Sequence, residues 1–186
     1  LFIGGQQITE SGCYEKNQEG NWTMVGGTEP ASGQFYYDGS ATLTLNGATI
    51  TGSGNSSSEP YGAGIYARCN TGQSVSLTIE LIGTNTITGY YGIYVNAEQG
   101  YTIGTDASLL IRNSGDNGSL EVSGSNYGIY VKSGTGDASL NIANASVDAK
   151  TTSTYSSYAG IYVMSSMNAT SSPQLSLAVN GGSLTT

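Results

Sequence analysis

The tyrosines of four Gly-Ile-Tyr segments have a spacing that could build a binding surface. They are Tyr66, Tyr94, Tyr130 and Tyr162, and each stands between two apolar residues. Alternate side chains of a β-strand point to opposite faces, so a tyrosine between two inward residues should point to solvent. Aromatic rings repeated in this way can stack on sugar rings while their hydroxyl groups form hydrogen bonds. Alternatively, the stacked tyrosines only stabilise the sheet through contacts between neighbouring strands.

Two aspartates, Asp106 and Asp137, each begin the sequence Asp-Ala-Ser-Leu. If these segments lie on adjacent repeats, the two carboxylates could bind calcium, which accepts oxygen ligands in flexible geometry. Alternatively, each aspartate starts a turn by hydrogen-bonding to the backbone, because Ser40, Ser74 and Ser172 stand at the equivalent positions. No other cofactor is expected.

A second acidic pair, Glu121 and Asp148, could support catalysis. Each follows an inward residue of a short strand, so the pair should lie on adjacent repeats and face solvent. Glycoside hydrolysis requires two carboxylates at such a separation. The alternative is a solvated acidic pair that only covers the surface. A lyase would need a basic residue beside a cation, but the chain has no histidine, and its five Lys and Arg residues form no evident cluster.

The segments that carry these residues recur about every 32 residues. Gly-Ile-Tyr begins at Gly64, Gly92, Gly128 and Gly160, and an apolar-x-apolar triplet begins at Leu43, Leu77, Leu109, Leu140 and Leu175. A third short strand is expected after each triplet, with the inward residues Ile50, Ile87, Leu120, Val147 and Leu184. One such repeat cannot bury its own apolar face, but stacked repeats can. The sequence therefore predicts an all-β chain folded as a right-handed parallel β-helix (β-solenoid) of about five three-stranded coils.

Residues 1–40 do not follow the repeat and contain the one tryptophan, Trp22. A solenoid needs its terminal coil protected from edge-to-edge association. We therefore expect an N-terminal β cap in residues 1–40 and parallel β-helix repeats in 41–186, within one domain. Cys13 and Cys69 could form a disulfide or remain two thiols.

The stretch from Tyr37 to Ile50, preceded by Ile3 to Thr9 and followed by the Gly-Ile-Tyr repeats, resembles the surface-exposed β-helix proteins of gut Firmicutes. The resemblance covers most of the chain and implies a pectate-lyase-like fold and a cell-surface location. Some relatives in that group are described as carbohydrate-binding. The chain departs from the true polysaccharide lyases, so their chemistry is not carried over.

Composition narrows the classes of partner. A net charge of -8 disfavours nucleic acid and anionic lipid surfaces, and no apolar run is long enough for membrane insertion. The low lysine content is typical of an extracellular protein. We expect a secreted or cell-surface, adhesin-like binding module that engages a glycan or surface polymer without catalysis. A polysaccharide-degrading enzyme (a glycoside hydrolase or lyase) and a structural stalk are the alternatives.

A catalytic groove is harder to assemble than a binding surface. The longest insertions between predicted strands, residues 52–61 and 150–158, contain Glu59 as their one acidic residue. The oligomeric state is left open by these patterns.

Overall fold

The fold is described from a computed structural model that covers residues 1–53, 58–70, 72–97, 106–115, 117–166 and 172–186. This part of the chain forms strands and no helix, so the all-β prediction is confirmed. Accordingly, no helix among these residues could span a membrane. The strands are β1 (Phe2–Ile3), β2 (Gln6–Gln7), β3 (Gly12–Lys16), β4 (Trp22–Met24), β5 (Gln34–Tyr37), β6 (Thr42–Asn46), β7 (Thr49–Thr51), β8 (Ile65–Arg68), β9 (Val75–Ile82), β10 (Thr84–Asn96), β11 (Ala107–Asn113), β12 (Ser119–Ser133), β13 (Ala138–Ala143), β14 (Ser146–Thr151), β15 (Ala159–Ser165), β16 (Leu175–Asn180) and β17 (Ser183–Thr185).

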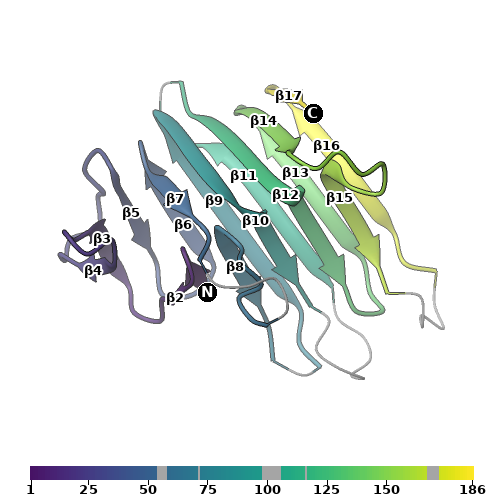
Figure 1. Cartoon of the computed structure of the whole chain (residues 1–186), viewed down its shortest axis with the longest axis horizontal. Helices are drawn as coiled ribbons and strands as arrows, with labels where there is room; N and C mark the ends of the chain where they lie inside the picture. Colours follow the sequence, from purple (N-terminus) through teal and green to yellow (C-terminus); the bar gives the residue numbers. More distant parts are fainter. Residues whose placement is uncertain (54–57, 71, 98–105, 116, 167–171) are drawn as a thin grey trace.

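These strands form two mixed sheets, which we call sheet A and sheet B. Sheet A has the order β17-β14-β12-β10-β8-β1-β2, with β15 also pairing with β12 and β7 with β10. Sheet B has the order β16-β13-β11-β9-β6-β5-β3-β4. Figure 1 shows the strands following one another along the long axis, with the N-terminal strands at one end and β14 to β17 at the other.

Strands one repeat apart lie side by side and run parallel. In sheet A, β10 pairs in parallel with β8 and β12, and β12 pairs in parallel with β15. In sheet B, the parallel series runs from β6 through β9, β11 and β13 to β16. The lateral pairing expected from the repeats is therefore present in both sheets.

The expected separation into three strands per repeat is wrong for the central repeats. Strands β10 and β12 each join a predicted third strand to the following Gly-Ile-Tyr segment, with a register shift between Gly89 and Tyr91. The corner at this shift is formed by Gly89 on β10 and its register partner Gly124 on β12. A Cβ atom at Gly124 would lie 1.9 Å from the carbonyl oxygen of Tyr127. Glycine allows the backbone to pass this corner without leaving the sheet.

Two expected alignments are also wrong by two residues. Ile87 pairs with Val122 instead of Leu120, and Leu43 pairs with Ile79 instead of Leu77. A shift of two residues keeps each side chain on the same face of its strand, so these residues stay in the core.

The core lies between the two sheets and is mainly aliphatic. One cluster of buried side chains joins sheet B residues such as Leu77 and Ile111 to sheet A residues such as Ile93 and Ile129. The inward orientation predicted for these positions is confirmed there. Leu175 and Leu177 on β16 are about half exposed, at 53% and 50%, because β16 is the last of the described strands in sheet B.

Residues 1–40 form β1 to β5 and pair antiparallel with the repeats. Phe2 on β1 pairs with Tyr66 on β8, and β5 pairs with β6. Trp22 packs edge-on against Phe35 with ring centroids 4.8 Å apart. Cys13 is buried and Cys69 half-buried, and both are free thiols.

Candidate functional site

The four tyrosines of the Gly-Ile-Tyr segments lie next to one another in sheet A. Tyr94 pairs in register with Tyr66 on one side and with Tyr130 on the other, and Tyr130 pairs with Tyr162. We call this row the tyrosine stack. Its buried members belong to a cluster separate from the aliphatic core, so the rings point to the opposite face of the sheet, as parity predicts.

The expectation that this row is open to solvent is wrong for three of its four members. Tyr66 is 0% exposed, Tyr94 7% and Tyr130 8%, whereas Tyr162 is 40% exposed. Further aromatic rings cover the first three. Their ring centroids lie 5.5 Å (Tyr61 to Tyr66), 4.8 Å (Tyr91 to Tyr94) and 5.0 Å (Tyr127 to Tyr130) apart. Because their faces are occupied by other side chains, these three rings have no free surface for a sugar.

The buried hydroxyl groups of Tyr66 and Tyr130 bind protein atoms. Tyr66 donates a hydrogen bond to Glu59 Oε1 at 3.0 Å and accepts one from Asn96 Nδ2 at 3.4 Å. Burial raises the pKa of Tyr66 above its ordinary value; the Asn96 hydrogen bond opposes this effect and the Glu59 carboxylate adds to it.

The hydroxyl group of Tyr130 also binds a protein atom. Tyr130 donates a hydrogen bond to Met164 Sδ at 3.0 Å. Burial, followed by the neighbouring tyrosines, raises the pKa of Tyr94 and Tyr130. All three phenols are therefore neutral members of a packed aromatic layer at physiological pH.

Exposed rings gather where the tyrosine stack reaches β15. Tyr162 stacks on Tyr127 with centroids 5.0 Å apart, and Tyr158 lies edge-on to Tyr127 at 5.6 Å. Tyr155 is 73% exposed and lies edge-on to Tyr158 at 6.2 Å. We call Tyr155, Tyr158 and Tyr162 the tyrosine platform. It combines accessible rings with a packed aromatic base, which is the arrangement that stacking on a sugar requires.

The two carboxylates that could support catalysis, Glu121 and Asp148, lie side by side in sheet A. Glu121 on β12 and Asp148 on β14 are register partners in parallel strands. They line a hollow of about 140 Å³ that also includes Thr86 and Lys150. Lys150 forms an ion pair with Asp148 Oδ2, and this contact raises the pKa of the ammonium group. The second oxygen, Asp148 Oδ1, is buried without a hydrogen-bond partner among the described atoms. The site could polarise a small polar group, but its ion pair occupies one of the two carboxylates.

The proposed calcium ligands use their carboxylates to connect repeats. Asp106 Oδ1 accepts a hydrogen bond from the backbone N–H of Asp137 at 2.9 Å. Asp137 Oδ1 in turn accepts one from the N–H of Gln174 at 2.8 Å, and Ser74 Oγ accepts one from the N–H of Asp106 at 3.2 Å. Each side chain thus caps the next repeat instead of its own turn. Within the described ranges, no group of three or more acidic or thiol side chains could hold a metal ion.

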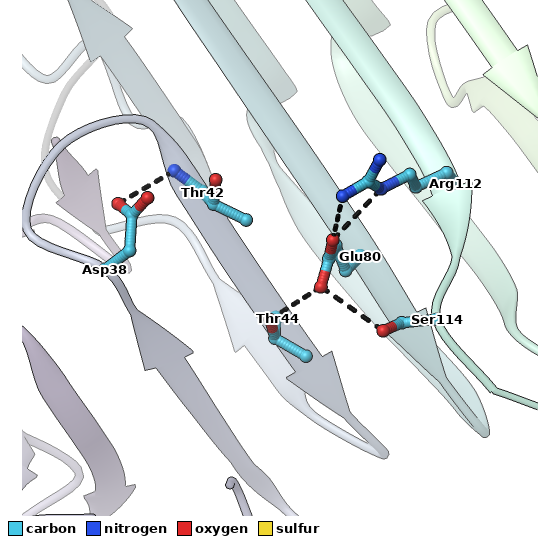
Figure 2. Close-up of polar contacts among 6 residues, drawn as sticks. All are labelled: Asp38, Thr42, Thr44, Glu80, Arg112 and Ser114. Atoms are coloured by element: carbon cyan, nitrogen blue, oxygen red, sulfur yellow. Dashed lines mark hydrogen bonds and ion pairs between the residues drawn. The ribbon is translucent and has the colours of Figure 1, made fainter. Parts of the chain in front are cut away.

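Arg112, one of the few candidate bases for a lyase, is engaged by a carboxylate. Figure 2 shows Glu80 on β9 accepting hydrogen bonds from Arg112, Ser114 and Thr44, which lie on or next to the flanking strands. Burial alone would raise the pKa of Glu80, but Arg112 and the two hydroxyl groups lower it below its ordinary value. Arg68 forms a similar ion pair with Glu59, at 2.7 Å. The two arginines thus stabilise the carboxylates beside them and do not share one site.

A further carboxylate in Figure 2, Asp38, closes the loop before β6. It accepts hydrogen bonds from the backbone N–H groups of Ser40, Ala41 and Thr42 at 2.8–2.9 Å. Burial opposes ionisation, but these bonds lower the pKa of Asp38 to about 2. Its role is that of a loop anchor.

Another hollow, of about 570 Å³, lies beside the N-terminal strands and is lined by residues that include Gly5, Asn21, Trp22 and Ser53. Trp22 is only 3% exposed, because Phe35 packs against it and Lys16 Nζ lies 5.1 Å from its ring centroid. This hollow therefore offers polar groups without an accessible aromatic face.

Sequence reasoning missed two positions. Tyr155 lies outside the Gly-Ile-Tyr register, and only the repeated occurrence of tyrosine upstream of these segments could have indicated it. Asn85 is fully buried on β10, where its Oδ1 accepts a hydrogen bond from the N–H of Ala48 at 2.8 Å and its Nδ2 donates to carbonyl groups that include that of Ser119. A polar residue at an inward position was the available signal.

No protein-family model, no curated protein and no solved structure matches this chain.

Proposed function

We propose that this chain is a right-handed parallel β-helix that acts as a non-catalytic binding module for a neutral glycan or surface polymer. The parallel pairing of segments one repeat apart in both sheets supports the β-helix. Connections between parallel strands of one sheet are almost always right-handed, which supports the hand. The residues before β6 act as its N-terminal cap.

The tyrosine platform is the observation that carries the binding proposal. Its three rings are accessible to different degrees; Tyr162 stacks on Tyr127 and Tyr130, Tyr158 lies edge-on to Tyr127, and Tyr155 lies edge-on to Tyr158. Rings held in place by neighbours lose little conformational entropy when a ligand binds. No charged residue occurs from Thr151 to Thr186, so the surface suits a neutral ligand.

A secreted or cell-surface setting fits this proposal, as does kinship with the surface-exposed β-helix proteins of gut Firmicutes. The platform replaces the tyrosine stack as the proposed contact surface, because Tyr66, Tyr94 and Tyr130 are buried.

A glycan-array screen, followed by calorimetry on each hit, tests the proposal. We expect Tyr155→Ala and Tyr162→Ala each to weaken binding by about two- to tenfold, since loss of one stacked ring removes about 0.5–1.5 kcal/mol. Tyr36→Ala is the matched control, because Tyr36 is a half-buried tyrosine on β5 in the other sheet. Equal binding by all four proteins, or loss in the Tyr36 variant alone, would reject the platform.

The enzyme alternative is tested on the same glycans. We expect no release of reducing ends or unsaturated uronides. Release that disappears in Glu121→Gln but persists in Glu15→Gln, an exposed acidic residue on β3, would establish catalysis and overturn the non-catalytic proposal.

A further inference from the structure

Three half-buried tyrosines cover the tyrosine stack, one from each of three successive repeats. They are Tyr61 before β8, Tyr91 on β10 and Tyr127 on β12, and we call them the covering row. All three pack against the buried members of the tyrosine stack. Each stands just upstream of a Gly-Ile-Tyr segment, so the covering row recurs with the repeat.

Each ring of the covering row contacts two consecutive rings of the tyrosine stack. The centroid distances are 5.5 and 5.9 Å from Tyr61 to Tyr66 and Tyr94, 4.8 and 5.6 Å from Tyr91 to Tyr94 and Tyr130, and 5.0 and 5.0 Å from Tyr127 to Tyr130 and Tyr162. Two packed neighbours hold each ring in place, although part of its surface stays exposed. A ligand therefore meets rings that have little conformational freedom left to lose.

The covering row and the tyrosine platform form one continuous surface. Tyr91 and Tyr127 are register partners, and their rings lie within 9° of parallel with centroids 6.1 Å apart. Tyr127 then contacts Tyr158 and Tyr162 of the platform. We call the covering row together with the platform the tyrosine strip. It passes from β10 to β12 to β15, which pair side by side, so the strip runs across the strands.

The phenols in the middle of the strip are uncharged hydrogen-bonding groups. Burial raises the pKa of Tyr91 and Tyr127 above the ordinary value, so both keep their protons at physiological pH. The side chain of Asn126 forms a hydrogen bond with Tyr91, and Tyr127 donates one to the carbonyl oxygen of Ser157 at 3.3 Å. These groups suit a neutral ligand that is rich in hydroxyl groups.

The spacing of the strip selects a ligand that itself repeats. Adjacent strands lie about 4.8 Å apart, so a ligand that follows the strip passes a new tyrosine after each such step. The length of one sugar unit in an extended chain is similar to this separation. A chain of sugar units can therefore contact successive rings, whereas a single sugar covers only part of the strip.

We propose that the tyrosine strip binds a linear, neutral polysaccharide whose chain lies across β10, β12 and β15. This inference rests on the proposed function and names its ligand class: an extended chain that is recognised along several repeats, instead of a terminal sugar held at the platform alone. The net charge of -8 disfavours an acidic polymer.

A length series tests the proposal. The probes are neutral gluco-, manno- and xylo-oligosaccharides, each from the disaccharide to the hexasaccharide, titrated into the 186-residue chain in a calorimeter. We expect the affinity for at least one series to rise with chain length, by about two- to tenfold for each further ring that the chain covers. Equal affinity for the disaccharide and the hexasaccharide would overturn the proposal, and so would equally tight binding of acidic polygalacturonate.

Substitution of Tyr91 separates the strip from the platform. Tyr91→Leu keeps an apolar side chain over Tyr94 but removes the ring and its hydroxyl group, so the gain in affinity from disaccharide to hexasaccharide should fall about two- to tenfold. Tyr36→Leu, at a half-buried position in the other sheet, is the matched control and should keep the full gain. Circular dichroism checks that both variants are folded.

Failure of this inference can be told from failure of the proposed function. If a glycan binds and the binding depends on Tyr155 and Tyr162 but not on chain length or Tyr91, the platform stands and the strip is wrong. If no neutral glycan binds in the array or the length series, the proposed function is wrong and the strip falls with it.

Discussion

The rings of Tyr94 and Tyr130 lie parallel, with centroids 4.7 Å apart and an interplanar angle of 3°. The two residues are register partners on β10 and β12, so the spacing of the strands sets the spacing of the rings. Both rings are buried on the face of sheet A that lies opposite the aliphatic core. Sheet A is therefore packed on both faces here, by aliphatic side chains on one and by tyrosines on the other.

Truncation of this layer should destabilise the fold strongly. We expect Tyr94→Ala to lower the free energy of unfolding by about 3–5 kcal/mol, because it removes a buried aromatic ring and leaves a cavity. Urea denaturation monitored by circular dichroism measures the change. Tyr162→Ala, at a 40% exposed position in the same stack, should cost about 1 kcal/mol or less. Equal losses for the two variants would mean that burial does not govern stability in this row.

The buried phenols should make the protein sensitive to alkali. Burial raises the pKa of Tyr94 above its ordinary value of 10.0, so the folded state keeps a proton that the unfolded state releases. The unfolded state then binds fewer protons, and stability falls as pH rises above about 10, by about 1.4 kcal/mol per pH unit for each such tyrosine. Below that pH the same group has no effect on the pH dependence.

Urea denaturation at about pH 8, 9.5 and 11 tests this slope. In Tyr94→Phe, the free energy of unfolding should fall less steeply above about pH 10, by about 1.4 kcal/mol per pH unit, because phenylalanine cannot ionise. Tyr155→Phe is the control, since it removes a hydroxyl group from a ring that is 73% exposed. A slope that is the same in all three proteins would reject the linkage.

The orientation of these tyrosines was predictable from sequence, but their burial was not. Strand parity places Ile93 in the core and Tyr94 on the opposite face, and both placements hold. The cover over that face depends on where neighbouring segments lie. Phe2 contacts Tyr66 from β1, an antiparallel strand near the beginning of the sequence, with ring centroids 5.9 Å apart. No local pattern contains that contact.

The same distinction applies to the carboxylates. Repeat spacing correctly placed Glu121 beside Asp148, because a parallel register follows from aligned segments. It could not show that Lys150 pairs with Asp148, since that contact depends on side-chain conformation. It also could not show that Asp106 binds the backbone of the next repeat, because such a bond depends on the path of the turn.

The Asp106 bond leads to a prediction about calcium. Asp106→Ala should lower the free energy of unfolding by about 1 kcal/mol through loss of the acceptor for the Asp137 N–H, whereas Asp106→Asn should retain most of the stability because its amide oxygen can accept that bond. Thermal unfolding with millimolar calcium and with a chelator should give the same midpoint for the wild type. A calcium-dependent rise in the wild type that both variants lose would instead support a calcium site at Asp106 and Asp137.

The corner at Gly124 gives the sharpest test of the continuous strands β10 and β12. A Cβ atom there would lie 1.9 Å from the carbonyl oxygen of Tyr127, and the obstructing atom is backbone that cannot move aside cheaply. Gly124→Ala should therefore lower the free energy of unfolding by about 1–3 kcal/mol or more, since it overpacks a rigid site.

Gly115→Ala is the matched control, because a Cβ at Gly115 would meet nothing within 4 Å. That variant should be neutral or slightly stabilising, because alanine reduces the entropy of the unfolded chain. Denaturation of the two variants side by side decides the matter: if Gly124→Ala is as stable as Gly115→Ala, the backbone does not take this path from the third strand into the Gly-Ile-Tyr segment, and the strand breaks at the corner as the sequence alone had suggested.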